Sequence, residues 1–163
     1  MAVTGETERR EAAERLALTL VGVGMQRMGA RALAAFLFSE QETLTAADLA
    51  SELGVSAGSV SGAVRMVAQM GLIERVHVAG SRREHFRMRD NAWTTLYTRQ
   101  HSVVDEVLRA VDEGVDAVGA GRARDRLEYM RDFYAFLLNE APVLVERFEA
   151  QRAESQRRGG SRP

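Results

Sequence analysis

The sequence predicts a mainly α-helical protein with a small β-hairpin wing: a winged helix-turn-helix flanked by N- and C-terminal helices that serve dimerisation. Three observations support this fold class. Two short amphipathic segments meet at a tight turn, Gly54-Val55-Ser56. Two β-like runs, 72–78 and 84–88, follow directly. The last third of the chain then returns to apolar residues at spacings of three and four.

Composition is that of an ordinary globular protein and excludes several chemistries. The 163 residues are 45% hydrophobic and 28% charged, with a net charge of −1. The absence of Cys removes disulfides, thiolate zinc sites and cysteine nucleophiles. All 22 basic side chains are Arg, so a P-loop lysine and a Schiff-base lysine are also absent. Because no pair of residues is marked as catalytic, we expect no enzyme, no cofactor and no metal.

The chain shows no sign of membrane insertion or export. Its longest apolar run, Ala32 to Phe38, is far shorter than the ~18 residues of a membrane helix. The first residues are rich in Glu and Arg, unlike a signal peptide. We therefore expect a cytoplasmic protein with no membrane partner. Residues 155–163 have nothing to bury, and we expect a disordered tail there.

Residues 7–26 are expected to form an N-terminal helix. Apolar residues recur in it at spacings of three and four (Ala13, Leu16, Leu20 and Val23), beginning near Thr7. Glycines at 22, 24 and 29 weaken the pattern, so the chain is expected to bend near Met25. A second helix over about 28–38 then belongs to the winged helix-turn-helix module, 27–90.

The middle of that module contains the clearest helix signals. Thr45 precedes Asp48 by three residues, which resembles a capping box at the start of a helix over Ala46–Leu53. Gly54 is suited to end this helix in a left-handed conformation, and Ser56 is suited to cap the next. The second helix, Ala57–Gln69, is expected to bury one apolar side, composed of Val60, Ala63, Val64 and Val67.

The hairpin is expected to fold about Ser81, with Val76 opposite Phe86 and His77 opposite His85. One face would then carry Val76, Val78, Phe86 and Met88, and the other Arg75, His77, His85 and Arg87. Two histidines with no third ligand beside them make a poor metal site. We therefore expect them to be solvated or to face phosphate.

Residues 91–154 are expected to form C-terminal dimerisation helices. Apolar residues recur at helical spacing from Trp93 to Val118 and again from Leu127 to Phe148, with glycines between the two runs. Pro142 is expected to kink the second helix or to begin a new one. Phe133 and Phe136 give that helix a second apolar side, which predicts packing against a second subunit.

Charge and side-chain size in the middle module indicate DNA binding. Residues 56–89 hold six Arg and two Glu, a local charge of +4 within an otherwise acidic chain. Small residues at the start of the 57–69 helix allow close approach to the major groove, where Arg65 suits guanine and Gln69 adenine. Arg82 and Arg83 at the hairpin tip are expected in or beside the minor groove. The expected DNA-binding residues are Ser56, Ala57, Gly58, Ser59, Ser61, Gly62, Arg65, Gln69, Arg75, Arg82, Arg83 and Arg87.

Two further interpretations stay open. The basic module could instead be a protein-interaction module that docks an acidic partner, although a protein interface would prefer aromatic anchors on its helix. The aromatic residues predict core and dimer packing, or a small-molecule pocket between the DNA-binding module and the C-terminal helices. The residues expected to bind such an effector are Arg27, Arg31, Trp93, Tyr97, Phe133 and Tyr134.

The sequence resembles the MarR-type winged-helix regulators, and most of all the branch grouped with the GbsR regulators. Three stretches covering about 40% of the chain carry the resemblance: GMQRMGARALAAFLFSE at 24–40, LTAADLASELGVSAGSVSGAVRMVAQMGLIERV at 44–76 and GSRREHFRMRDNAW at 80–93. The wing departs from the usual Asp-x-Arg of such regulators, because it reads Gly80-Ser81-Arg82-Arg83. The resemblance implies a homodimer built from the N- and C-terminal helices, so that residues 7–26 would serve dimerisation. It also implies that the dimer binds a pseudo-palindromic DNA operator, usually represses nearby genes and often releases DNA when a small effector binds.

Overall fold

The computed structural model describes the backbone of residues 2–159 and the side chains of residues 5–99 and 103–158. The fold is mostly helical with one small antiparallel sheet, which confirms the predicted fold class. The chain divides into two units, one ending at Leu96 and the other beginning at Tyr97. Among the described residues, no helix is long and apolar enough to cross a membrane.

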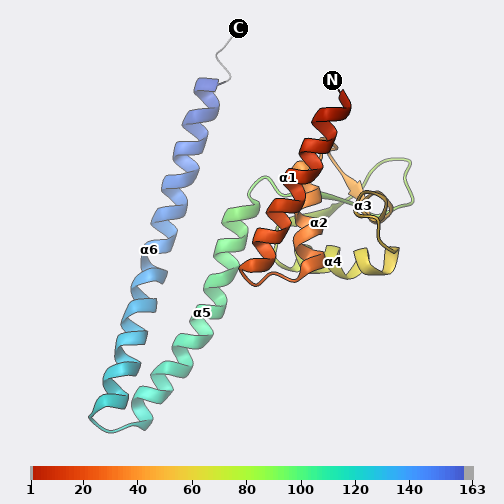
Figure 1. Ribbon diagram of the computed structural model, residues 1–163. Helices are drawn as coiled ribbons and strands as arrows, with labels where there is room; N and C mark the ends of the chain where they lie inside the picture. The colour runs from red at the N-terminus through yellow and green to blue at the C-terminus, as the bar shows by residue number, and fades with distance from the viewer. Residues whose placement is uncertain (1, 160–163) are drawn as a thin grey trace. The chain divides into compact units, whose positions relative to one another are not determined.

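The first unit is built on α2 (Arg27–Phe38), which contacts three other helices (Figure 1). These are α1 (Ala2–Gly22), α3 (Ala46–Leu53) and α4 (Ala57–Gln69). Small buried residues line the contact between α1 and α2, namely Ala17, Ala30 and Ala34. The largest fully buried side chains of the unit are Leu33, Leu49, Leu72, Ile73, Val60 and Val67. This core joins the helix-turn-helix to the sheet.

Local hydrogen bonds define the helix-turn-helix as the sequence predicts, and α3 and α4 have the expected bounds. The Thr45 hydroxyl accepts from the amide of Asp48 (3.2 Å), and the Asp48 carboxylate accepts from the amide of Thr45 (2.8 Å). Gly54 ends α3 at φ 64°, in the left-handed region. The Ser56 hydroxyl then caps α4 by accepting from the amide of Ser59.

The sheet has three strands in the order β1-β3-β2: β1 (Leu44–Thr45), β2 (Ile73–Val76) and β3 (His85–Met88). Sequence analysis found the hairpin but missed β1, which is only two residues long. The expected register was also wrong, because Phe86 lies opposite Arg75 and His85 lies opposite Val76.

The core accounts for this register. Ile73 is only 1% exposed and pairs with Met88, so its burial anchors the alternation of side chains along β2. A difference of one residue in register moves a strand's side chains to the other face. Val76 consequently shares a face with His85, not with Phe86. His77 follows the end of β2 and is exposed, and the expected pair of histidines does not form.

The second unit is an antiparallel pair formed by α5 (Ala92–Ala117) from Tyr97 onward and α6 (Arg122–Gly159) (Figure 1). The guanidinium of Arg124 donates to the carbonyl of Val115 (3.0 Å) and so ties the turn to the end of α5. Pro142 lies inside α6 and does not begin a new helix.

The helices at both ends of the chain are longer than expected. α1 begins at Ala2 and not near Thr7. α6 continues to Gly159, so the expectation of disorder from residue 155 was wrong as far as 159, and residues 160–163 lie outside the described residues. Glu154 and Arg158 form an ion pair at i,i+4 in this part of α6, a spacing that supports helix formation.

We expect Asp48→Asn to lower the free energy of unfolding by about 1 kcal/mol near neutral pH, because it replaces a charged acceptor in the first turn of α3 with a neutral one. The side-chain hydrogen bond from Thr45, then its backbone amide, holds the pKa of Asp48 below the usual 3.8. A carboxyl with a lowered pKa in the folded state stabilises the fold above that usual value and loses its contribution as the pH falls further.

Urea denaturation should therefore show a gap between wild type and Asp48→Asn at about pH 7 that narrows at about pH 3. Glu40→Gln is the control, because Glu40 is exposed. A gap of equal size at both pH values would contradict the role of this carboxylate.

Candidate nucleic-acid interface

Helix α4 presents opposite faces to the core and to solvent. Val60, Ala63, Val64 and Val67 are buried, as expected. All eight residues that sequence analysis assigned to the outward side are exposed: Ser56, Ala57, Gly58, Ser59, Ser61, Gly62, Arg65 and Gln69. The contacts of α4 with α2 and α3 hold it in this orientation. The outward face is thus available to a partner along the whole helix.

The two glycines of this face are not required by packing within the chain. A Cβ built on Gly62 would meet no heavy atom within 4 Å, and one on Gly58 would only come within 3.9 Å of the Ser56 hydroxyl. Gly inside a helix costs roughly 1 kcal/mol relative to Ala. The two glycines leave the N-terminal end of α4 flat, and the backbone amides there favour a phosphate group. The gain from this flat surface offsets the cost of the glycines only if a partner molecule approaches α4 closely.

The arginines of the interface differ in how they are engaged. Among the described residues, the side chains of Arg65, Arg82 and Arg83 are exposed and make no hydrogen bond or ion pair. Arg75 instead pairs with Glu84 at 2.7 Å, and Arg87 with Glu74 at 2.9 Å. The hydrogen bond to Glu74 raises the pKa of Arg87. The structure therefore separates three unengaged cations from two that neighbouring carboxylates already hold.

Sequence analysis named Ser81 and His85 but missed the hydrogen bonds by which they and Thr43 organise the wing. The Ser81 hydroxyl accepts from the amide of Arg83 and lies within hydrogen-bond distance of His85, whose ring also contacts Thr43. Ser81 precedes Arg83 by two residues, a spacing at which a hydroxyl readily accepts from the backbone. The hydrogen bond between them could therefore have been predicted from the sequence. Thr43 lies 42 residues from His85 and gave no such signal.

The six residues expected to bind an effector are divided between the two units. Arg27, Arg31 and Trp93 belong to the first, and Tyr97, Phe133 and Tyr134 to the second. Within the second unit, the rings of Phe133 and Tyr134 meet edge to face at 5.4 Å. Effector binding by these six residues stays a prediction.

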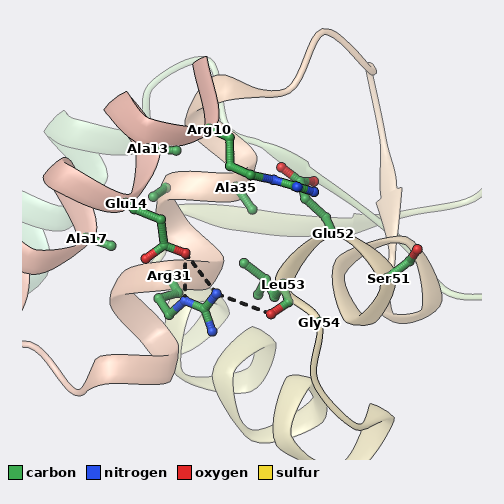
Figure 2. A pocket seen from close by; sticks show the side chains of 11 residues that line it. Arg10, Ala13, Glu14, Ala17, Arg31, Ala35, Ser51, Glu52, Leu53 and Gly54 are labelled. Carbon is green, nitrogen blue, oxygen red and sulfur yellow. Dashed lines mark hydrogen bonds and ion pairs between the residues drawn. The ribbon is translucent and has the colours of Figure 1, made fainter. Parts of the chain in front are cut away.

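Arg31 has a structural role within the first unit. Figure 2 shows its guanidinium bonded to Glu14 of α1 and to the carbonyl of Leu53 at the end of α3. These bonds are 2.8–3.2 Å long and connect α1, α2 and the helix-turn-helix turn. The three bonded residues line a pocket of about 380 Å³, and Arg10 and Glu52 form another part of its wall.

Helix α6 of the second unit carries an exposed apolar face. Its members recur at helical spacing: Tyr129, Phe133, Phe136, Leu137, Val143, Leu144 and Phe148. Phe136 alone leaves 60% of its surface exposed. A face of this length is the kind of surface that a partner covers.

Comparison with known proteins gives matches over most of the chain. Residues 23–84 match the family model described as the MarR family, and residues 91–151 match that of MmpR5-like MarR family transcriptional regulators. The HTH-type transcriptional regulator MmpR5 of Mycobacterium tuberculosis (strain ATCC 25618 / H37Rv) is 33% identical over 133 residues, which cover 80% of each protein. A crystal structure of a transcriptional regulator is 30% identical with a TM-score of 0.78, covering 88% of this chain and 99% of that one.

Proposed function

This chain belongs to the MarR family of transcriptional regulators, which bind DNA, and from that premise we propose that two copies of it bind a pseudo-palindromic operator and repress the genes nearby. The outward face of α4 carries the proposal, because it combines small residues over open space with the unengaged Arg65. Each copy would insert α4 into a major groove, with half-sites about one helical turn apart.

The wing adds affinity more than sequence preference in this proposal. Arg82 and Arg83 are exposed cations at the tip of the hairpin and suit the narrow minor groove of A·T-rich DNA. Arg75 and Arg87 must exchange their glutamates for phosphates before they contribute, so we expect less from them. Arg65, which lies on α4, is expected to read a base.

A second copy of the chain is the proposed partner of the α6 apolar face. Burial of several aromatic and aliphatic side chains there would stabilise a dimer, at roughly 25 cal/mol per Å² of apolar surface removed from water. A dimer also matches the two-fold symmetry of a palindromic operator. Release of the operator by a small effector, and membership of the branch grouped with the GbsR regulators, stay proposals of the same kind.

Selection of bound fragments from genomic DNA at two salt concentrations tests the function directly, and Arg65→Ala tests its specificity. Wild type should enrich a palindromic motif that survives the higher salt. The variant should lose preference at one position in each half-site, at a cost of about 1–3 kcal/mol. Arg126→Ala on α6 removes the same charge from an exposed position and should leave the motif unchanged.

Motif-free binding by wild type that vanishes with salt would contradict an operator-binding regulator and favour an acidic protein partner instead. An unaltered motif in Arg65→Ala would remove that residue from base recognition.

Joint replacement of Arg82 and Arg83 by Ala should weaken binding to all sequences alike. Each phosphate contact contributes about 0.9 to the slope of log K against log salt, so the slope for a dimer should fall by about 2 to 4. Fluorescence anisotropy with operator and random duplexes over a salt series measures both quantities. A slope equal to that of wild type would show that the wing does not contact DNA.

Phe136→Glu should convert the protein from dimer to monomer at micromolar concentration, because it buries a charge in the proposed interface. Phe136→Leu keeps the site apolar and should stay dimeric. Sedimentation equilibrium distinguishes the two states, and a monomeric wild type would overturn the proposed dimer.

A further inference from the structure

The tip of the wing is held by a chain of hydrogen bonds that contains no carboxylate. The amide of Arg83 donates to the Ser81 hydroxyl at 3.2 Å. The same hydroxyl lies 2.8 Å from Nε2 of His85, and Nδ1 of His85 lies 3.1 Å from the hydroxyl of Thr43. We call Thr43, His85 and Ser81 the wing relay.

A neutral imidazole satisfies every member of the wing relay. In one neutral tautomer Nε2 of His85 would accept from the Ser81 hydroxyl and Nδ1 would donate to Thr43; in the other Nε2 would donate to Ser81 and Nδ1 would accept from Thr43. In both, the Ser81 oxygen accepts from the amide of Arg83. The relay therefore needs no charged group to be complete.

The wing relay connects the tip to β3, the central strand of the sheet. His85 begins β3 and pairs with Val76 of β2 on one side and with Thr45 of β1 on the other. Thr45 is itself the N-cap of α3. At the other end of the relay, Ser81 closes a turn by donating its amide to Val78, with Gly80 at φ 79°. The loop is thus anchored on both sides of its apex.

The arginines of the wing differ in whether a carboxylate holds the side chain. Arg75 and Arg87 are held by glutamates, and a DNA phosphate must compete with those carboxylates for them. The hydrogen bond of Arg83 within the wing relay is made by its backbone amide, so a phosphate meets its guanidinium without displacing a carboxylate. The carboxylate of Asp48 attracts Arg83 without forming an ion pair with it.

We propose that the wing relay is the positioning device that holds Arg83 ready for a DNA phosphate while leaving its side chain unpaired. This inference rests on the proposed binding of DNA by the wing. The relay residues act through Arg83 and need not touch DNA themselves. A backbone that is already held in place loses less conformational freedom on binding, which strengthens the contact made by its side chain.

A double-mutant cycle with Ser81→Ala and Arg83→Ala tests this dependence. Ser81→Ala should weaken DNA binding about five- to tenfold and lower the salt slope, because the loss of the hydroxyl removes its hydrogen bonds with the amide of Arg83 and with His85 and so frees the tip. In the Arg83→Ala background the same change should cost less than about twofold. Ser81→Thr retains the hydroxyl and should bind like wild type.

Limited trypsin digestion without DNA gives a second readout that does not depend on the proposed function. Cleavage after Arg82 and Arg83 should be faster in Ser81→Ala than in wild type or Ser81→Thr, while cleavage elsewhere and the melting temperature stay unchanged.

The outcomes separate the two proposals. If wild type binds DNA but Ser81→Ala costs the same in both backgrounds, or leaves tryptic cleavage at the tip unchanged, the wing relay does not position Arg83. If wild type and Arg83→Ala have the same affinity and salt slope, the contact of Arg83 with DNA is overturned, whereas DNA binding by the wing as a whole is tested by the joint replacement of Arg82 and Arg83.

Discussion

The close contact between α2 and α4 is the constraint on which the first unit depends. Gly29 has no side chain, and the end of the Met66 side chain occupies the space beside it: a Cβ there would lie 1.7 Å from Cε of Met66, so any other residue would displace that side chain. The burial of Val60, Val64 and Val67 sets which side of α4 faces the core. Its small, polar side then faces outward, and the candidate interface follows from the packing of the opposite side.

The sheet performs a different task, since it sets where the charges of the wing lie. Pairing of β3 with both β1 and β2 places His85 between the helix-turn-helix and the wing tip. Glutamates of the same hairpin hold Arg75 and Arg87, whereas hydroxyl groups and an imidazole organise the backbone at Arg83. The local charge of +4 therefore overstates the number of arginines that are free to meet a phosphate. The usable positive charge is concentrated on α4 and at the tip of the wing.

A third set of contacts links the N-terminal helix to the helix-turn-helix. Arg31 bonds to Glu14 of α1 and to the carbonyl of Leu53 at the end of α3, so one side chain connects α1 with the turn before α4. The pocket beside this bond is lined by charged and small apolar side chains and opens next to the helix-turn-helix (Figure 2). The apolar face of α6 belongs to the second unit, where it supplies surface that a subunit partner can bury.

The sequence by itself determined the helices and their ends in the helix-turn-helix. The capping box of Thr45 and Asp48, the left-handed Gly54 and the Ser56 cap all use hydrogen bonds or conformations confined to about four residues. The exposed side of α4 was predictable for a similar reason, because helical periodicity assigns a face once the apolar side is known. Only the tertiary structure decided the register of the hairpin, the existence of β1 and the contact of His85 with Thr43. Each of these features depends on contacts between segments that are separate in the chain. The burial of Leu72 and Ile73 in the core brings these segments together. The local sequence does not show which side of the strand is buried, and the register depends on that side.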